Sequence, residues 1–149
     1  MPIVETSQGD ILHSSYQTLV CPTNVVGVMG AGLAKHMAYR IVGLKQAYQS
    51  ACRLGLVGVG KLWVYPCGSN QQILCLSTKK HWKDPSKLAY VEAGLQALVD
   101  HYEELGIKGI SVPPLGCGLG GLDWETQVKP LIIQYLDPLP IPIELISPY

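Results

Sequence analysis

The sequence has 149 residues with 11 basic and 11 acidic side chains, and only 15% of its residues are charged. This length fits one domain with a substantial hydrophobic core, and a hydrophobic content of 48% excludes a disordered protein. A formal net charge of zero excludes a surface coated with positive charge, so any contact with nucleic acid must come from a local patch.

The sequence gives no sign of a targeting or membrane segment. No apolar run approaches the ~20 residues that span a bilayer, and the N-terminus MPIVETSQGD lacks the pattern of a secretory signal. The five cysteines are an odd number without a C-x-x-C pair, which argues against a disulfide framework and a structural zinc site. We therefore expect a single cytoplasmic domain over residues 1–149 that is monomeric and contacts no membrane.

Short strands and helices alternate along the chain. In chain order we predict strands at Ile3–Thr6 and Thr18–Cys21, helices at Gly32–Ile41 and Leu44–Arg53, strands at Leu62–Tyr65 and Gln72–Ser77, a helix at Pro85–Leu105, a strand at Gly109–Val112, a helix at Asp123–Tyr135 and a strand at Ile143–Ser147. This order predicts an α/β fold with a mostly parallel or mixed sheet. Ligands of such sheets bind at the carboxyl ends of the strands.

Punctuating residues mark the ends of the two later helices. Pro85 suits the first turn of one helix and Gly106 its C-terminal end, while Asp123 suits the N-cap of the next. Pro130 lies inside that next helix, where we expect it to interrupt or kink the backbone.

Two glycine-rich loops each connect a predicted strand to a predicted helix. The first is Gly27-Val28-Met29-Gly30-Ala31-Gly32, and the second contains four glycines within Gly116–Gly121. Backbone amides of such loops can cradle phosphates, although a single glycine-rich loop is more often just a turn. The first loop is neither a P-loop nor a Rossmann fingerprint, because it lacks their spacing and partner residues.

Two further segments follow predicted strands. Asp10 after the first strand is either a turn former or a carboxylate that accepts from an exocyclic amine such as adenine offers. Lys79 follows the fourth predicted strand and is either a solvated surface charge or an amine that enters the crevice as a nucleophile or electrostatic clamp. His81 is more typical of a loop histidine than of a general base.

Taken together and in this order, these segments resemble the macrodomain family of ADP-ribose binders and hydrolases. The resemblance rests on Gly9-Asp10-Ile11, Pro22-Thr23-Asn24, the first glycine loop and Val112-Pro113-Pro114-Leu115-Gly116-Cys117-Gly118, and it covers essentially the whole chain. Four features look most like the DarG branch: the first glycine loop, Thr78-Lys79, the Trp82 region and the run from Pro114 to Trp124. The terminal ADP-ribose protein glycohydrolases look like the next relatives. The fold implied is a three-layer α/β/α sandwich around a mixed, mostly parallel sheet.

The resemblance implies a role for each matching residue. Asp10 would read adenine with Ile11 beside it, Asn24 would hold the distal ribose, and Lys79 would be catalytic. The ADP-ribose-binding set that it implies is Asp10, Ile11, Asn24, Gly27, Val28, Met29, Gly30, Ala31, Gly32, Thr78, Pro114, Leu115, Gly116, Cys117, Gly118, Leu119, Gly120 and Gly121. No metal and no cofactor are required on this account.

The activity implied is removal of ADP-ribose from thymidine in single-stranded DNA, which reverses the modification made by a DarT-type toxin. Alternatives are hydrolysis of ADP-ribose esters on acidic protein side chains, of O-acetyl-ADP-ribose or of ADP-ribose-1″-phosphate, and a non-catalytic ADP-ribose-binding module. The terminal glycohydrolases carry an acidic residue at the position of Gly120, so its absence here favours the DarG-like activity.

Two features bear on partners. DarG proteins carry a further C-terminal domain, and since this sequence ends at Tyr149 we expect a stand-alone glycohydrolase with a functional link to a DarT-type toxin. Four lysines, at positions 79, 80, 83 and 87, accompany one acidic residue, Asp84. We expect these four lysines to present a small positive patch to a DNA strand although the chain is neutral overall.

Overall fold

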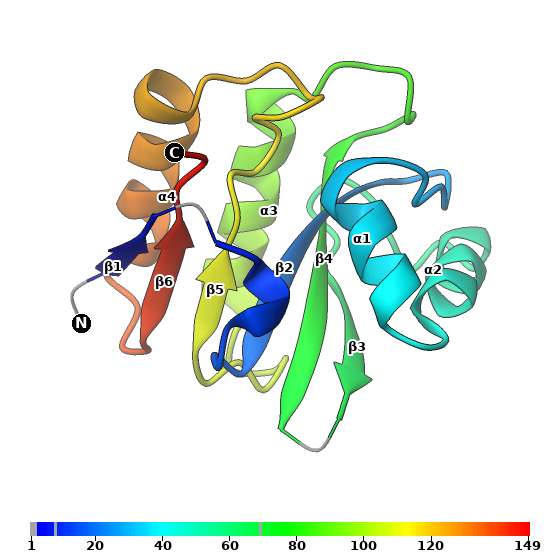
Figure 1. The fold of residues 1–149 in the computed structure, drawn as a ribbon, viewed down its shortest axis with the longest axis horizontal. Helices are drawn as coiled ribbons and strands as arrows, with labels where there is room; N and C mark the ends of the chain where they lie inside the picture. The colour runs from blue at the N-terminus through cyan, green and yellow to red at the C-terminus, as the bar shows by residue number, and fades with distance from the viewer. Residues whose placement is uncertain (1–2, 8, 69) are drawn as a thin grey trace.

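The computed structural model describes residues 3–7, 9–68 and 70–149 (Figure 1). Its elements in chain order are β1 (Ile3–Thr6), the 3₁₀ helix η1 (Ile11–His13), β2 (Thr18–Asn24), α1 (Gly32–Arg40), α2 (Leu44–Arg53), β3 (Trp63–Cys67), β4 (Gln71–Lys79), α3 (Leu88–His101), β5 (Ile110–Val112), the π-helical turn η2 (Trp124–Val128), α4 (Lys129–Leu136) and β6 (Ile143–Ile146). No helix in these described ranges is long and apolar enough to cross a membrane.

The strands form one six-stranded sheet in the order β1-β6-β5-β2-β4-β3. All neighbours pair in parallel except β3, which runs antiparallel to β4 at one edge. The mixed, mostly parallel sheet is therefore confirmed. Because β5, β2 and β4 are parallel neighbours, the loops that follow them meet at the same edge of the sheet.

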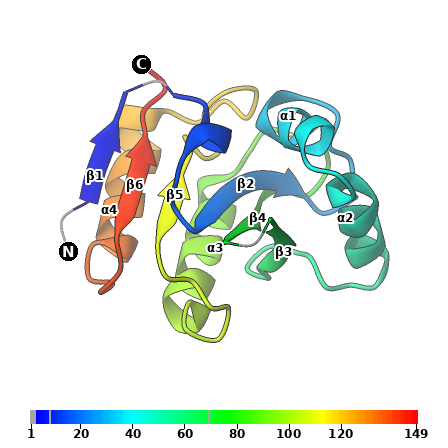
Figure 2. The same ribbon diagram turned by 60° about the horizontal axis from the view of Figure 1, so that its bottom comes forward.

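Helices cover both faces of the sheet, and the side chains of β2 alternate between them. Leu19 and Cys21 pack with Met37 of α1 and Tyr48 of α2, whereas Val20 packs on the other face with residues of α3 and α4. Figures 1 and 2 show α3 and α4 together behind the sheet and α1 and α2 on its opposite side. This confirms the three-layer α/β/α sandwich.

Helix α3 begins three residues later than predicted, at Leu88. The amides of Ser86 and Lys87 donate instead to carbonyls outside the helix, those of Gly120 (2.9 Å) and Thr78 (3.0 Å). The proline of the expected first turn therefore lies in a loop, and that part of the prediction is wrong.

Helix α3 ends at His101, four residues before the predicted end at Leu105, and hydrogen-bonded turns continue the chain to Gly106. Gly106 adopts a φ of +69°, its amide donates to the carbonyl of Glu103 (3.0 Å), and the Ile107 amide donates to that of Tyr102 (2.9 Å). These two bonds are the pair that commonly closes a helix at a glycine.

The last predicted helix is two elements. Asp123 caps η2 as predicted, because its carboxylate accepts from the amide and the hydroxyl of Thr126 at 2.8 and 2.6 Å. Pro130 is the second residue of α4, and the π-helical turn directly precedes it, so that the Lys129 amide donates to the carbonyl of Trp124 five residues back. The predicted interruption is confirmed.

Strands β2 and β4 extend further than predicted, to Asn24 and Lys79. These two residues are register partners on the neighbouring strands, so both lie at the ends of strands rather than in the following loops. Their positions are consequently set by the sheet itself.

Candidate functional site

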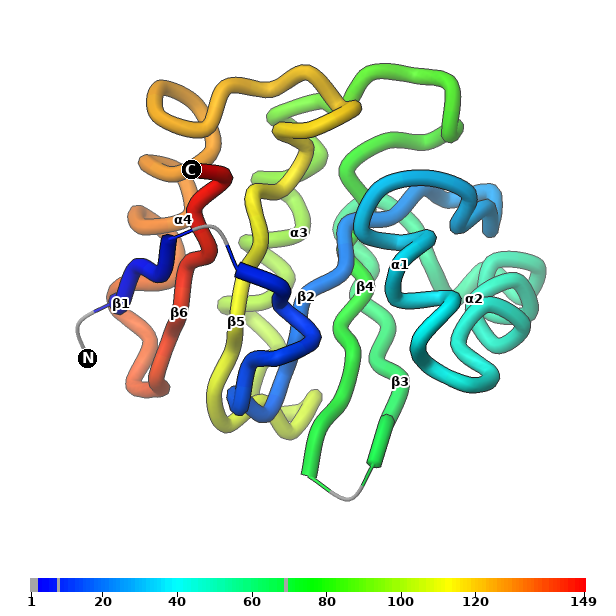
Figure 3. Tube along the Cα trace, in the orientation of Figure 1, coloured from blue at the N-terminus to red at the C-terminus, as the bar shows by residue number. Residues whose placement is uncertain are grey.

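A cleft of about 1090 Å³ opens at the carboxyl ends of β2, β4 and β5. We call it the main cleft. A second cavity of about 380 Å³, the side cavity, lies beside η1 and α1. Gly32, Leu33, Pro113 and Pro114 line both, so the two cavities are neighbouring parts of one groove. Figure 3 shows the chain passing along this edge of the sheet in the loops after β2, β4 and β5.

Most of the predicted site residues lie in this groove. Those that line the main cleft are Asn24, Val28, Gly30, Ala31, Gly32, Thr78, Lys79, Pro114, Gly116, Cys117, Gly118, Leu119 and Gly120. Asp10 and Ile11 line the side cavity together with Gly32 and Pro114. The groove therefore brings together residues from four separate segments of the chain.

Four predicted residues lie outside both cavities as the structure describes them: Gly27, Met29, Leu115 and Gly121. Met29 and Leu115 are buried in the two hydrophobic cores, where they anchor the two glycine loops. Gly27 has a φ of +85° and packs against Gln49 of α2. Met29, Leu115 and Gly27 therefore hold loop backbone in place rather than form the surface of the groove.

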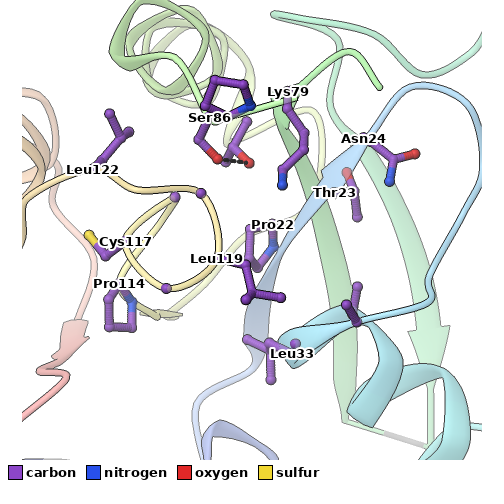
Figure 4. Close-up of a pocket in the computed structure, with 18 of the residues that line it drawn as sticks. Pro22, Thr23, Asn24, Leu33, Lys79, Ser86, Pro114, Cys117, Leu119 and Leu122 are labelled. Carbon is purple, nitrogen blue, oxygen red and sulfur yellow. Dashed lines mark hydrogen bonds between the residues drawn. The ribbon is translucent and has the colours of Figure 1, made fainter. Parts of the chain in front are cut away.

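Lys79 is the residue of the main cleft best suited to chemistry. It is the last residue of β4 and is half-buried. Figure 4 shows its amine directed into the cleft, between Ser86 on one side and Thr23 on the other. A primary amine placed there can act as a nucleophile or as a cation, and the sheet fixes the start of its side chain.

The first glycine loop is held by the side chain of Asn24. Its Nδ2 donates to the carbonyl of Val28 (2.8 Å), and its Oδ1 accepts from the amides of Val26 (3.2 Å) and Val28 (3.3 Å). Asn24 is buried, so these bonds are largely shielded from water. In this structure the amide group that the resemblance assigns to a ribose thus organises the loop.

The first turn of α1 follows this loop and lines the main cleft through Gly32, Leu33 and Ala34. Among the described residues, no side chain caps this helix, because Ala31 occupies the N-cap position. First-turn amides have no partner within the helix, and the helix dipole adds partial positive charge there. The helix start therefore offers donors to an anion bound in the cleft.

The second glycine loop closes on Ser86. A Cβ atom at Gly120 would lie 2.1 Å from the Ser86 Oγ and 2.5 Å from the Gly116 carbonyl oxygen. The Ser86 hydroxyl in turn donates to the Thr78 Oγ1 (3.2 Å) at the end of β4. The loop is therefore packed tightly beside Lys79, with no room for a side chain at position 120.

Asp10 presents a carboxylate at the side cavity. Its Oδ1 accepts from the Leu12 amide (3.0 Å) at the start of η1, and its Oδ2 lies 3.2 Å from the His36 Nε2. The bond from Leu12, followed by that from His36, lowers the pKa of Asp10 below its usual value of 3.8. The carboxylate is therefore ionised at neutral pH and able to accept from an amine.

Cys117 also lines the main cleft but is unsuited to nucleophilic attack. Burial, together with the negative charge of Asp123, raises the pKa of its thiol to about 11. The thiol is therefore protonated at neutral pH. In the part of the chain that the structure describes, no three His, Cys, Asp or Glu side chains gather closely enough to hold a metal ion.

Sequence reasoning missed several residues of the groove, among them Leu33, His36, Ser86 and Tyr149. Leu33 directly follows the first loop, so its position could have been inferred. Ser86 falls instead within a predicted helix, His36 lies one helical turn after Leu33 on α1, and Tyr149 reaches the groove only through tertiary packing. Trp82 belongs to a segment that carries the resemblance, and it lines the main cleft.

Comparisons with known proteins agree with this geometry. The family model of the Macro domain matches residues 20–130. The DNA ADP-ribosyl glycohydrolase of Mycobacterium tuberculosis is 42% identical over 133 residues, which are 87% of this chain and 38% of that protein. A DNA ADP-ribosyl transferase–DNA ADP-ribosyl glycohydrolase fusion protein of Thermosipho africanus is 38% identical over 95% of this chain and 41% of its own length.

Two solved structures have the same fold. The macrodomain of M. tuberculosis DarG superposes on this chain with a TM-score of 0.92 at 39% identity, and the alignment covers 99% of each chain. T. africanus DarTG in complex with ADP-ribose gives a TM-score of 0.89 at 37% identity, over 96% of this chain and 41% of that one. This chain spans about 40% of the length of the curated relatives that it matches. It belongs to the Macro domain family.

Proposed function

We propose that this chain binds ADP-ribose in the groove and removes it from ADP-ribosylated thymidine in single-stranded DNA. The observation that carries the proposal is the amine of Lys79, which is directed into a cleft walled by two glycine-rich loops. Relatives 38–42% identical to this chain are named for the hydrolysis of ADP-ribosyl groups on DNA, which supports the same reaction here.

The groove suits ADP-ribose from one end to the other. The ionised Asp10 in the side cavity is an acceptor for the exocyclic amine of adenine. The uncapped start of α1 and the backbone of the two loops offer amides to the diphosphate. The distal ribose then lies in the main cleft, where Lys79 reaches its anomeric carbon.

The reaction needs a group that favours departure of the base. The bond between the anomeric carbon and the thymine nitrogen breaks, its electron pair stays on the nitrogen, which is protonated, and water supplies the hydroxyl of the released ADP-ribose. A lysine amine assists either by attacking the anomeric carbon of the ring-opened sugar, which gives an imine that water hydrolyses, or by electrostatic stabilisation. Reduction with borohydride during turnover separates these routes, because only the imine becomes a stable adduct.

The substitution Lys79→Ala tests the proposal. We expect release of ADP-ribose from a modified single-stranded oligonucleotide to fall at least ~100-fold, while calorimetric affinity for free ADP-ribose changes by less than about threefold. Lys108→Ala is the matched control, because Lys108 is exposed and precedes β5 at the opposite end of the sheet. If the wild-type chain leaves modified DNA intact, or if Lys79→Ala is as active as the control, the proposal is wrong.

The geometry of Gly120 bears on the choice of substrate. An acidic side chain at this position would collide with Ser86 and with the Gly116 carbonyl, so this loop could not present one without rearrangement. The groove therefore suits the DarG-like reaction better than hydrolysis of esters on protein side chains. The same assay with ADP-ribosylated protein and with O-acetyl-ADP-ribose tests this preference.

We also propose a functional link to a DNA ADP-ribosyl transferase. The relative from T. africanus is named as a fusion of such a transferase with the glycohydrolase, which supports the pairing of the two activities. Co-expression tests the link: this chain should relieve growth inhibition by the transferase, and the Lys79→Ala variant should not.

A further inference from the structure

An exposed aromatic and basic segment lies beside Lys79, in the loop between β4 and α3 and the first turn of α3. We call it the lip; its members are Lys80, His81, Trp82, Lys83, Lys87 and Tyr90. Figure 1 shows this loop rising above the carboxyl end of β4. The segment contains no acidic residue except Asp84, although the chain as a whole is neutral.

Trp82 is the centre of the lip. Its side chain is 50% exposed and lines the main cleft, and it belongs to neither of the two hydrophobic cores among the described residues. His81 stacks on it with ring centroids 5.5 Å apart, and the Lys83 Nζ lies 5.2 Å from its ring centroid. Trp82 therefore presents part of its indole surface at the main cleft, beside a second ring and a lysine amine.

The remaining lysines gather around a second ring. The Nζ atoms of Lys80 and Lys87 lie 5.7 and 5.4 Å from the ring centroid of Tyr90. Aromatic rings interleaved with lysines form the pattern that binds single-stranded nucleic acid, in which bases stack on the rings and phosphates meet the charges. Lysines on a face without aromatic rings would be interpreted only as solvated surface charges.

The lip lies at the end of the groove from which the DNA must emerge. Asp10 marks one end of the groove, in the side cavity, whereas Lys79, Trp82 and Lys83 line the main cleft. With adenine at Asp10 and the anomeric carbon at Lys79, the thymine and its neighbouring nucleotides leave the cleft at Lys79. Trp82 is three residues further along the chain and is the aromatic surface offered to them.

We propose that the lip is a binding site for single-stranded DNA flanking the modified thymidine, in which Trp82 stacks on a base and Lys83, Lys80 and Lys87 contact phosphates. This inference rests on the proposed function, because it assigns the nucleotides that surround the reacting base. It also predicts a preference for single strands, because in a duplex the bases already stack on each other and present no free face to Trp82.

The first test compares two substrates that differ only in their flanking nucleotides. ADP-ribosylated thymidine nucleoside reaches Lys79 but not the lip, whereas a 10-nucleotide ADP-ribosylated oligonucleotide reaches both. We expect Trp82→Ala to lower kcat/KM about tenfold for the oligonucleotide and less than twofold for the nucleoside. Trp82→Phe keeps a stacking surface and should retain most of the activity on the oligonucleotide.

Tyr39→Ala is the matched control for this variant. Tyr39 is 87% exposed in the last turn of α1, away from the main cleft, so its removal should change neither kcat/KM. If Trp82→Ala lowers kcat/KM equally for both substrates, Trp82 acts on the sugar or the loop rather than on flanking DNA, and the inference is overturned.

The second test measures the charges. Binding of an unmodified fluorescein-labelled single strand should weaken with salt, and removal of one lysine–phosphate pair should reduce the slope of log K against log salt by about 0.7. We expect the Lys83→Ala/Lys87→Ala variant to reduce this slope by about 1.4, and Lys45→Ala/Lys108→Ala, which removes the same charge elsewhere, to leave it unchanged. Equal slopes for the two double variants would overturn the inference.

Failure of this inference and failure of the proposed function give different results. If the wild type hydrolyses ADP-ribosylated DNA and Trp82→Ala has no effect, the inference about the lip is wrong and the proposed function stands. If the wild type hydrolyses no ADP-ribosylated DNA, the proposed function is wrong. Fluorescence anisotropy still decides whether the lip binds DNA: it compares the affinity for the unmodified single strand with that for the same sequence as a duplex, both in saturating ADP-ribose. A Trp82→Ala variant that binds the single strand as tightly as the wild type contradicts the lip in either case.

Discussion

The two glycine-rich loops of the groove look alike in the sequence, but different forces hold them. Hydrogen bonds from Asn24 fix the first loop, and its segment Gly30–Gly32 is exposed. Packing against Ser86 fixes the second loop, in which Gly116 and Gly120 are buried and Gly118 is exposed. A high glycine content therefore predicts a loop at a ligand site without predicting what maintains its shape.

The difference lies in the reason for each glycine. A Cβ added at Gly30 would meet only the Val28 Cγ1, at 3.4 Å, which is an ordinary contact. Space does not require a glycine here, and its effect is to leave the loop backbone open to a ligand. A Cβ at Gly120 would collide with side-chain and backbone atoms at once. The first loop should consequently be sensitive to removal of a hydrogen-bonding group, and the second to any gain in volume.

The largest effect should come from Gly120→Asp. Overpacking of this kind costs about 3 kcal/mol, which corresponds to a fall in Tm of roughly 6–12 °C for a chain of this size. Displacement of the loop should also abolish measurable ADP-ribose binding by calorimetry. The variant tests whether volume alone controls the second loop.

Gly118→Asp is its internal control. It adds the same side chain and charge to the same loop, but no heavy atom lies within 4 Å of a Cβ at this position and its φ is not positive. Its Tm should stay within about 2 °C of the wild type. If Gly118→Asp lowers the Tm as much as Gly120→Asp does, charge rather than space governs the second loop.

A smaller effect should follow Asn24→Ala. The change removes three hydrogen bonds and leaves the carbonyl and amide of Val28 and the amide of Val26 without these partners. We expect the free energy of unfolding to fall by about 2 kcal/mol and hydrogen exchange to become faster in the first loop alone. Denaturant titration and exchange mass spectrometry measure the two quantities.

Asn70→Ala serves as the comparison for that variant, because Asn70 is exposed before β4 at the opposite end of the sheet. It should change the free energy of unfolding by less than about 0.5 kcal/mol. Faster exchange throughout the chain, rather than in the first loop alone, would show that Asn24 supports the whole fold and would remove the contrast between the loops.

Most of the fold could be predicted from the sequence because its signals are local. Apolar runs predict all six strands, and Asp123 marks the start of η2 through capping. Gly106 closes the turns that follow α3 rather than the helix itself, which ends at His101. The predicted start of α3 is wrong because the amides of Ser86 and Lys87 bond to distant segments, which no local pattern reveals.

The residues around the groove could also be predicted from the sequence, but their individual roles could not. Family motifs identify the residues around it, but a motif does not distinguish a residue that lines the surface from one that anchors the backbone. Met29 and Leu115 lie within the two loops and are buried in the cores. Nor does a motif reveal pairs made by packing, such as Asp10 with His36 or Gly120 with Ser86. Such contacts depend on how the layers come together.

The smallest predicted effect concerns the carboxylates that accompany the two loops. Asp10 lies at the side cavity with Gly32 of the first loop, and Asp123 follows the second. Both have pKa values below 3.8: the amide of Leu12 is the main cause for Asp10, and the hydroxyl of Thr126 for Asp123. Thr126→Val removes the main cause of the lowered pKa of Asp123, whereas His36→Ala removes a lesser cause of the lowered pKa of Asp10.

NMR titration should therefore show a larger rise in the pKa of Asp123 in Thr126→Val than of Asp10 in His36→Ala, with neither rising above about 3.8. A lowered pKa stabilises the fold above the unfolded value, and this contribution disappears only as the pH falls through the folded pKa. Asp10 thus stays ionised from about pH 5 to 8, so any change in ADP-ribose affinity over that range must arise elsewhere. An equal or larger rise at Asp10 would mean that His36, rather than the η1 backbone, fixes the charge at the side cavity.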